Sequence, residues 1–195
     1  MKKSLGPLPL SYPLPVFLIG SYDAAGKANI MNAAWGGICA SEPPCLAVSV
    51  RESRWTYACI MQRKAFTISI PSVSLAAKAD FAGIASGRNT DKFARLGLTA
   101  TRSAVVDAPY IEECPVAIEL SLVTTLPVGS HVQFVGEVKD VKVDEGCLDP
   151  DGLPDVLRVN PILYETVRKN YHAIGPVVAS AFDCGKMFLH AQHPA

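Results

Sequence analysis

Two long runs of strand-forming residues constrain the fold of this chain more than any other feature. Residues 116–125 and 130–143 are rich in β-branched and aromatic side chains, and the turn segment Pro127-Val128-Gly129 lies between them. This pattern predicts a long antiparallel hairpin. Short strands dominate the rest of the chain, without the regular βαβ alternation of a doubly wound sheet. The chain is therefore predicted to be mainly β, a barrel with short helical insertions, because a closed or partly closed barrel removes exposed sheet edges.

Local patterns predict the other elements. Residues 23–26 supply turn chemistry between two apolar runs, which indicates a second hairpin. Ser53, Ser72 and either Thr90 or Asp91 are candidate N-caps of three short helices, and Gly97 is a candidate helix end. The predicted strands span 16–22, 28–35, 46–50 and 65–70, the helices 53–64, 72–80 and about 91–96, with a loop at 81–89, a turn at 149–155 and mixed strand and loop at 162–171.

The length and charge of the chain limit its organisation and its partners. With 195 residues, 49% of them hydrophobic, the chain is predicted to form a single domain with an extended N-terminal arm over 1–11 and a C-terminal tail over 176–195. Lys plus Arg and Asp plus Glu balance at 18 each, so there is no basic field suited to many phosphates. Nucleic acid is not expected as a partner.

The N-terminal region resembles a targeting signal only superficially. Lys2 and Lys3 precede an uncharged stretch over 4–22, but prolines at positions 7, 9, 13 and 15 prevent the continuous helix of a membrane span or signal peptide. No membrane partner is expected. The six cysteines show no CxxC and no Cys/His pair at zinc spacing, which predicts reduced, structural thiols and a cytoplasmic protein.

Several motifs of other enzyme classes are excluded by their spacing. Residues 20–27 resemble a phosphate loop, but five residues separate Gly20 from Gly26-Lys27, and Ala28 stands where a hydroxyl is needed. No GxSxG, HExxH or GxGxxG occurs in the sequence. The histidines of the HAQH segment at 190–193 have ligand-like spacing but are interpreted as part of a frayed tail, so no metal site is predicted.

Polar residues gather in four clusters at 29–35, 49–56, 86–93 and 129–138. Together they supply an aromatic wall, hydrogen-bond donors, cations and hydroxyls, which is what an isoalloxazine ring with a ribityl phosphate requires. Other interpretations stay open. Trp35 could be a core residue, and Arg51 and Arg54 could form a solvated turn. His131 is equally compatible with a hydrogen-bonded histidine in the core and with a residue that contacts the ligand. Lys92 opposes the dipole of its predicted helix, which suggests an anion nearby.

Five motifs carry a family resemblance. NIMNAAW at 29–35, VSVRESRWTY at 48–57, SGRNTDKF at 86–93, ECPVAIEL at 113–120 and GSHVQFVGEV at 129–138 occur in this order. They resemble the flavin reductase-like family with the FMN-binding split barrel, most closely its flavoredoxin branch. The similarity extends from about Tyr12 to about Gly175. It implies an FMN-binding split β-barrel.

The resemblance also implies a homodimer with one FMN per subunit near the dimer interface. Arg51 and Lys92 are expected to anchor the phosphate, and Tyr164 matches a position that approaches the ring. Asn32 departs from the family pattern, in which threonine is usual. The candidate cofactor-binding residues are Asn29, Ile30, Met31, Asn32, Trp35, Ser49, Val50, Arg51, Arg54, Thr56, Arg88, Lys92, His131 and Tyr164.

Two classes of function follow from the resemblance. The first is an FMN-dependent oxidoreductase that takes hydride from NADH or NADPH. The second is an electron carrier of the flavoredoxin kind, which exchanges electrons with a redox partner protein. A non-catalytic flavin-binding protein is a third, weaker alternative. The sequence offers no protein acid, base or nucleophile, so catalytic residues are unassigned.

Overall fold

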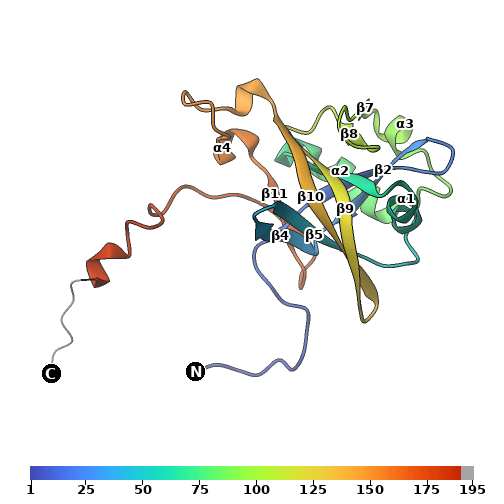
Figure 1. Cartoon of the computed structure of the whole chain (residues 1–195). Helices are drawn as coiled ribbons and strands as arrows, with labels where there is room; N and C mark the ends of the chain where they lie inside the picture. The colour runs from blue at the N-terminus through green and yellow to red at the C-terminus, as the bar shows by residue number, and fades with distance from the viewer. Residues whose placement is uncertain (190–195) are drawn as a thin grey trace.

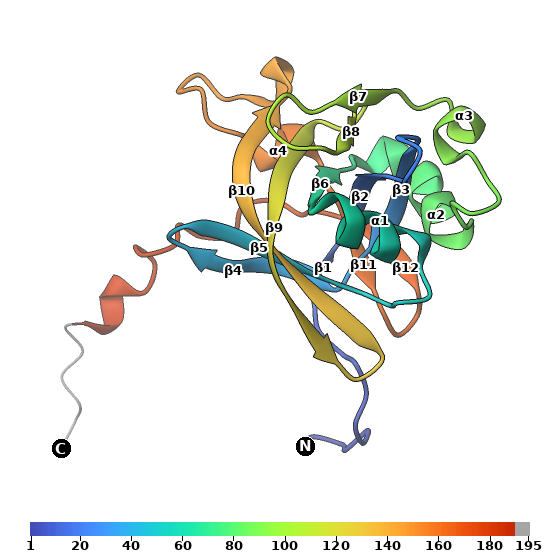
Figure 2. The same ribbon diagram turned by 45° about the vertical axis from the view of Figure 1, so that its right-hand side comes forward.

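The structure is a computed structural model that describes residues 1–189. Its centre is a seven-stranded antiparallel sheet in the order β3-β2-β6-β9-β10-β5-β4. The sheet curls until β3 contacts β5, so that it encloses a barrel, with α1, α2 and α3 on one side (Figures 1 and 2). Two smaller sheets, β1-β11-β12 and β7-β8, flank it. The predicted mainly β split barrel with short helical insertions is confirmed.

The long hairpin is confirmed with a tighter turn than predicted. Strands β9 and β10 pair from Val128 opposite His131 to Val116 opposite Val143, and Gly129 adopts a positive φ of 55° in the turn. Pro127 therefore lies inside β9 and not in the turn. The strands are β1 Leu14–Pro15, β2 Phe17–Tyr22, β3 Ala28–Ala33, β4 Gly36–Ser41, β5 Pro44–Val50, β6 Ala65–Ile70, β7 Ala100–Arg102, β8 Pro109–Ile111, β9 Val116–Val128, β10 His131–Val143, β11 Ile162–Glu165 and β12 Asn170–Ala173.

The helices differ from the predictions at their ends. Arg54, not Ser53, is the N-cap of α1, and it makes no side-chain capping bond. Ser72 precedes a 3₁₀ turn, η1, and α2 continues to Ile84 through part of the predicted loop 81–89. Asp91 does cap α3, since its Oδ1 accepts from Ala94 N at 3.1 Å. The helices are α1 Trp55–Arg63, α2 Ala76–Ile84, α3 Lys92–Leu96 and α4 Val156–Val159, with 3₁₀ turns η1 Val73–Leu75, η2 Glu145–Cys147 and η3 Lys186–Phe188.

Strands β2 and β3 are covered on both faces, which decides where their side chains point. Ile19 and Met31 pack inside the barrel against β5, β6, β9 and β10. Leu18 and Ile30 point the other way, into a second core with helices α2 and α3. The alternation follows from the two-residue period of a strand. Consecutive residues of the NIMN motif therefore face different environments.

Strand β8 crosses closely over β2 and β6. Thr67 Oγ1 donates to Pro109 O at 2.6 Å, and Ser69 Oγ accepts from Ile111 N at 3.1 Å. A Cβ at Gly20 would lie only 2.0 Å from Pro109 O. Position 20 is thus restricted to glycine by the close approach of two backbones.

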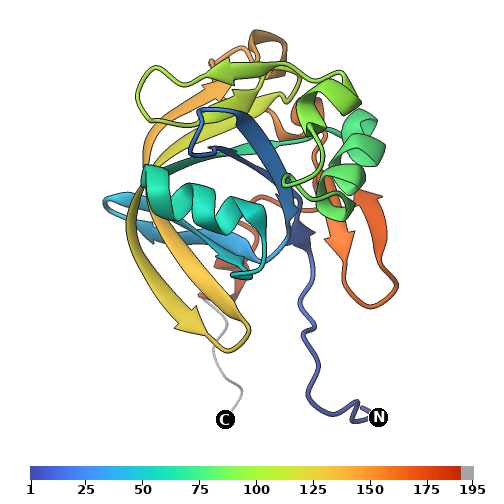
Figure 3. The ribbon, with the colours of Figure 1, turned by 90° about the vertical axis from the view of Figure 1, so that its right-hand side faces the viewer.

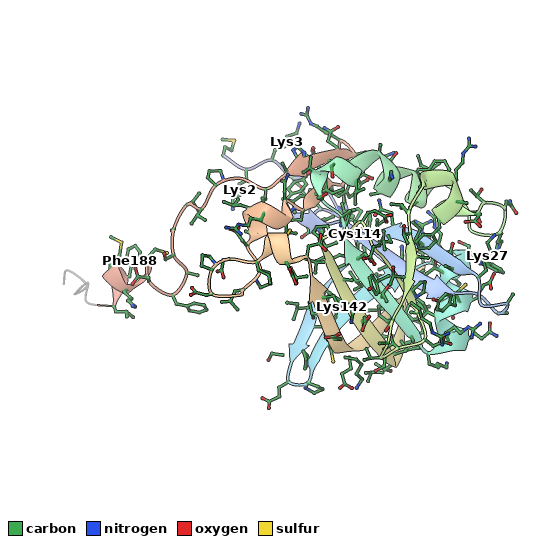
Figure 4. The ribbon with its side chains drawn as sticks, turned by 90° about the horizontal axis from the view of Figure 1, so that it is seen from above. Lys2, Lys3, Lys27, Cys114, Lys142 and Phe188 are labelled. Carbon is green, nitrogen blue, oxygen red and sulfur yellow. The ribbon has the colours of Figure 1, made fainter. Side chains whose placement is uncertain are left out.

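Two terminal segments leave the barrel and extend away from it (Figures 1 and 3). The N-terminal arm precedes β1, and the C-terminal tail follows β12. Exposed apolar side chains lie along the tail, among them Val178, Phe182 and Phe188. Phe188 lies far from the body of the protein, whereas Cys114 lies within it (Figure 4). The HAQH segment falls outside the described residues.

All six cysteines have free thiols; Cys45, Cys59 and Cys114 are buried, whereas Cys39 and Cys184 are exposed. Burial raises the pKa of Cys114 to about 12, so this thiol has little thiolate character. Within residues 1–189, no helix has the length and apolar character needed to cross a membrane. The same residues contain no group of three or more His, Cys, Asp or Glu side chains arranged to hold a metal ion.

Candidate functional site

Two cavities beside the helices have Arg54 in their linings. The first, here called the aromatic cavity, has a volume of about 260 Å³ and lies between the end of β3, helix α2 and the β11–β12 hairpin. The second, the cationic cavity, has a volume of about 230 Å³ and lies between α1, α3 and the segment after α2. Arg54 lines both because it stands at the start of α1.

Three aromatic side chains line the first cavity: Trp35, Tyr164 and Tyr171. The rings of Tyr164 and Tyr171 contact each other with centroids 5.7 Å apart. Polar groups stand among them, because Tyr171 Oη donates to Asp80 Oδ1 at 2.9 Å and accepts from Asn32 Nδ2 at 3.3 Å. Burial and the hydrogen bond to Asp80 raise the pKa of Tyr171 to about 12, so it keeps its proton. This cavity suits a planar molecule with a polar edge.

Lys92 is the central charge of the cationic cavity. Its side chain is 4% exposed, and Nζ donates to Ile30 O and Ala82 O, both at 2.7 Å. An ammonium carries three hydrogens, so one remains for a ligand. Burial, and to a lesser extent the charge of Arg54, lowers the pKa of Lys92 to about 8. A buried ammonium beside the exposed guanidinium of Arg54 is favourable when an anion binds between them.

The same contacts explain why Lys92 is tolerated in the first turn of α3. Ala82 belongs to the last turn of α2, where carbonyl groups lack helical partners. The ammonium reaches across to this helix end, at which a cation is favoured by the helix dipole. The sequence predicts only an anion opposite Lys92. The carbonyl partner at the end of α2 is not predicted, because the predicted helix ends at Asp80.

An unpaired buried acceptor lies behind the cationic cavity. Asn29 Nδ2 donates to Thr56 Oγ1 at 2.9 Å, but Asn29 Oδ1 is buried and has no hydrogen-bond partner among the described residues. Thr56 accepts this bond, so its own hydroxyl hydrogen is free for a ligand in the cavity that Thr56 lines. A Cβ at Gly87 would lie 2.1 Å from Asn29 Oδ1, so glycine lets the loop approach closely.

A second group of candidate residues lies at the ends of β5 and β10, outside the linings of both cavities. The rings of Trp35 and His131 stack with centroids 6.3 Å apart, and Ser130 Oγ and His131 Nδ1 are hydrogen-bonded at 2.9 Å. Burial and the nearby charge of Arg51 lower the pKa of His131. Trp35 links this group to the aromatic cavity, because it lines that cavity while it stacks on His131.

The structure thus divides the fourteen predicted residues. Asn32, Trp35, Arg54 and Tyr164 line the aromatic cavity, and Met31, Arg54, Thr56 and Lys92 line the cationic one, with Asn29 behind Thr56. The side chains of Ile30 and Val50 pack in the two cores. Ser49, Arg51, Arg88 and His131 line neither cavity, and Arg88 lies over the Trp55 ring at 5.7 Å from its centroid.

Sequence reasoning missed several lining residues. The residues not predicted include Ser53, Asp80, Gly83, Gly87, Lys169 and Tyr171. The SGRNTDKF cluster signalled the loop that carries Gly87. Tyr171 had no local signal, because β12 reaches the cavity only through its pairing with β11 and the contact of Tyr171 with α2.

Comparison with known proteins identifies the family of this site. The model of the flavin reductase like domain matches residues 10–174, most of the chain. The chain belongs to the flavin reductase-like family. The five motifs that resembled this family all lie inside the matched range, and so do all residues that line the two cavities.

Several solved structures are similar to this fold. Flavoredoxin of Desulfovibrio vulgaris (Miyazaki F) is 54% identical, with a TM-score of 0.92 over 95% of this chain and 100% of that one. Flavoredoxin from Methanosarcina acetivorans is 29% identical, with a TM-score of 0.87 over 96% and 98%. An FMN-binding protein from Thermus thermophilus is 25% identical, with a TM-score of 0.77 over 92% and 98%.

Proposed function

We propose that this chain is an FMN-binding flavoprotein that transfers electrons through the bound cofactor. The carrying observation is the pair of cavities that share Arg54, one with aromatic walls and one with a buried ammonium. An elongated ligand with a flat ring at one end and a phosphate at the other matches both. The flavoredoxins and the FMN-binding protein among the similar structures support the same cofactor.

The residues present fit this group. Lys92, Arg54 and Thr56 would hold the phosphate, since Lys92 has one free hydrogen and Thr56 a free hydroxyl hydrogen. Trp35, Tyr164 and Asn32 would hold the ring. Bound FMN supplies the electron-accepting chemistry, and the protein orients it and limits its contact with water. No side chain is assigned a catalytic role.

Identification of the bound cofactor tests the proposal directly. The purified protein is expected to be yellow and to release FMN, not FAD, on denaturation, because the cationic cavity suits one terminal phosphate and the chain has no dinucleotide motif. Chromatography of the released flavin measures this. Release of FAD, or no flavin after reconstitution with FMN, would contradict the proposal.

The pKa of Lys92 makes FMN affinity depend on pH. Below a pH of about 8 the ammonium exists before binding, and affinity is expected to be constant while the phosphate stays a dianion. Above that pH, binding requires uptake of a proton, so affinity should fall by up to about tenfold per pH unit. FMN titrations at several pH values from 7 to 10 measure the slope. A wild-type affinity that stays flat over this range would contradict the assignment of Lys92 to the phosphate.

We also propose that the protein acts as a homodimer with the cofactor near the interface. Exposed apolar side chains gather on β4 and on the outer part of the β9–β10 hairpin, including Ile38 at 81%, Leu126 at 55% and Val128 at 57% exposure. Trp35, Arg51 and His131 lie on the neighbouring strand ends. A second copy on this surface would have its cofactor close to Arg51 and His131 of the first copy, which accounts for these two candidates that line neither cavity of their own chain.

Dimerisation and cofactor binding are expected to be coupled. A ligand that contacts both subunits binds the dimer more tightly, and FMN at about a hundred times its Kd would stabilise that state by about 2.7 kcal/mol for each bound site. Sedimentation of apo and holo protein across a dilution series measures the coupling. A monomer that retains FMN at full affinity would contradict the shared site.

The proposed electron donor is either NAD(P)H or a redox partner protein. Mixing the holoprotein with NADH or NADPH in the absence of air distinguishes these two electron donors. Bleaching of the flavin absorbance within seconds supports the enzyme. Flavin that stays oxidised with both nucleotides, but is reduced by dithionite, supports the electron carrier.

A further inference from the structure

Asn32 is the residue of the aromatic cavity whose hydrogen-bonding role is most fully determined by its neighbours. Its Nδ2 donates to Ala79 O at 2.9 Å, and a backbone carbonyl can only accept. The orientation of the amide is therefore fixed, since the flipped amide would place two acceptors against each other. A Cβ at Gly83 would lie 3.2 Å from Asn32 Cβ, so helix α2 packs closely along the same side chain.

The second hydrogen of Asn32 Nδ2 is also used, on Tyr171 Oη at 3.3 Å. Tyr171 directs its own hydrogen to Asp80 Oδ1 at 2.9 Å, so its oxygen is an acceptor toward Asn32. The high pKa of Tyr171 is consistent with a phenol that keeps this hydrogen. The chain of hydrogen bonds from Asn32 through Tyr171 to Asp80 thus has one direction.

What remains of the Asn32 amide is Oδ1, which accepts from none of the described residues. A ligand group that meets it must carry a hydrogen-bond donor, because a carbonyl edge would be repelled. The oxidised isoalloxazine ring has one N–H, at N3, between two carbonyl groups. The remaining FMN donors are the ribityl hydroxyls.

We propose that Asn32 Oδ1 accepts the N3–H of the FMN ring, and that Tyr171 and Asp80 are positioning residues that fix Asn32 in this orientation. The proposal rests on the proposed function and adds to it the ring edge that the cavity recognises. It also gives a role to two residues that the sequence did not single out. A threonine at position 32 would be too short to span both Ala79 O and Tyr171 while it meets the ring.

Binding of FMN and of N3-methyl FMN tests the proposal, because the methyl group removes only the donor at this edge. Wild-type protein is expected to bind FMN about tenfold or more tightly than N3-methyl FMN. In Asn32→Leu, which keeps the number and branching of the side-chain heavy atoms, FMN affinity should fall about tenfold while N3-methyl FMN affinity changes by less than about twofold. Retention of the wild-type preference in Asn32→Leu would mean a steric effect and would overturn the proposal.

The ratio of the affinity for FMN to the affinity for N3-methyl FMN also tests the positioning residues Tyr171 and Asp80. Tyr171→Phe should lower the preference for FMN at least about threefold, whereas the control Tyr110→Phe, on β8 away from both cavities, should keep it. Asp80→Ala provides a second variant if Tyr171→Phe does not fold. A lower affinity for both flavins with an unchanged ratio would indicate a merely structural role and would overturn this part. Equal binding of both flavins by the wild type would overturn the Asn32 contact, and failure to bind either would instead overturn the proposed function.

Discussion

Replacement of Lys92 by methionine is expected to weaken FMN binding roughly ten- to a hundredfold and riboflavin binding much less. The physical reason is that only FMN carries the phosphate dianion that the third ammonium hydrogen would meet. A lost hydrogen bond to a charged group costs about 1.5–3 kcal/mol, which corresponds to this change in Kd. Methionine keeps the length of the side chain inside its buried site. Flavin fluorescence titrations with both ligands measure the two affinities.

The comparison of the two flavins separates the binding role of Lys92 from its structural one. Lys92 also holds Ile30 O and Ala82 O, so the variant is expected to be less stable. A general loss of structure would weaken both flavins equally, and that result would remove Lys92 from the phosphate. Lys27→Met is the matched control, because Lys27 is exposed, pairs with Asp91 at 3.0 Å and lines neither cavity. Its FMN affinity should change by less than about threefold.

Replacement of Gly20 by alanine is expected to destabilise the apoprotein by about 3 kcal/mol. The new Cβ would lie 2.0 Å from Pro109 O and 2.4 Å from Thr67 Oγ1, and would disrupt the hydrogen bond that joins those two atoms. One contact is with backbone, so a side-chain rotation cannot relieve it. Denaturant unfolding of wild type and variant measures the free energy difference.

Gly37→Ala is the control for this prediction. Gly37 also lies in a strand, β4, but no heavy atom lies within 4 Å of the position of its added Cβ. Its free energy of unfolding should change by no more than about 0.5 kcal/mol. Equal stabilities of the Gly20 and Gly37 variants would show that β8 moves aside easily, contrary to the close crossing in this structure.

Most of the barrel could be predicted because its strands carry their own signals. The two long runs that form β9 and β10 have strand-forming composition over many residues, and β2 and β3 flank a clear turn. Strand β4 was missed because it begins with Gly36-Gly37 and its turn contains Pro43, which in sequence resemble a loop. Strands β7 and β8 have three residues each, too few for a periodic pattern.

The extent of α2 was wrong for a reason that bears on the site. Gly83 lowers the helix propensity of its segment, so a loop was predicted there. In the structure, the glycine allows α2 to pack against Asn32, and tertiary contact outweighs local propensity. Of the candidate site, residues clustered in sequence could be found. Tyr171 and Asp80, brought to Asn32 by the tertiary fold, could not.

Arg54 stands between the aromatic and the cationic cavity and lines both. Its Nη1 lies 3.5 Å from Gly83 O, at the edge of hydrogen-bonding distance, so its position depends on the same helix that holds Asn32 and Lys92. A fragment that filled one cavity would meet a charge that also lines the other. The affinities of a ring fragment and a phosphate fragment are therefore not independent, and their free energies of binding do not sum to that of the intact cofactor.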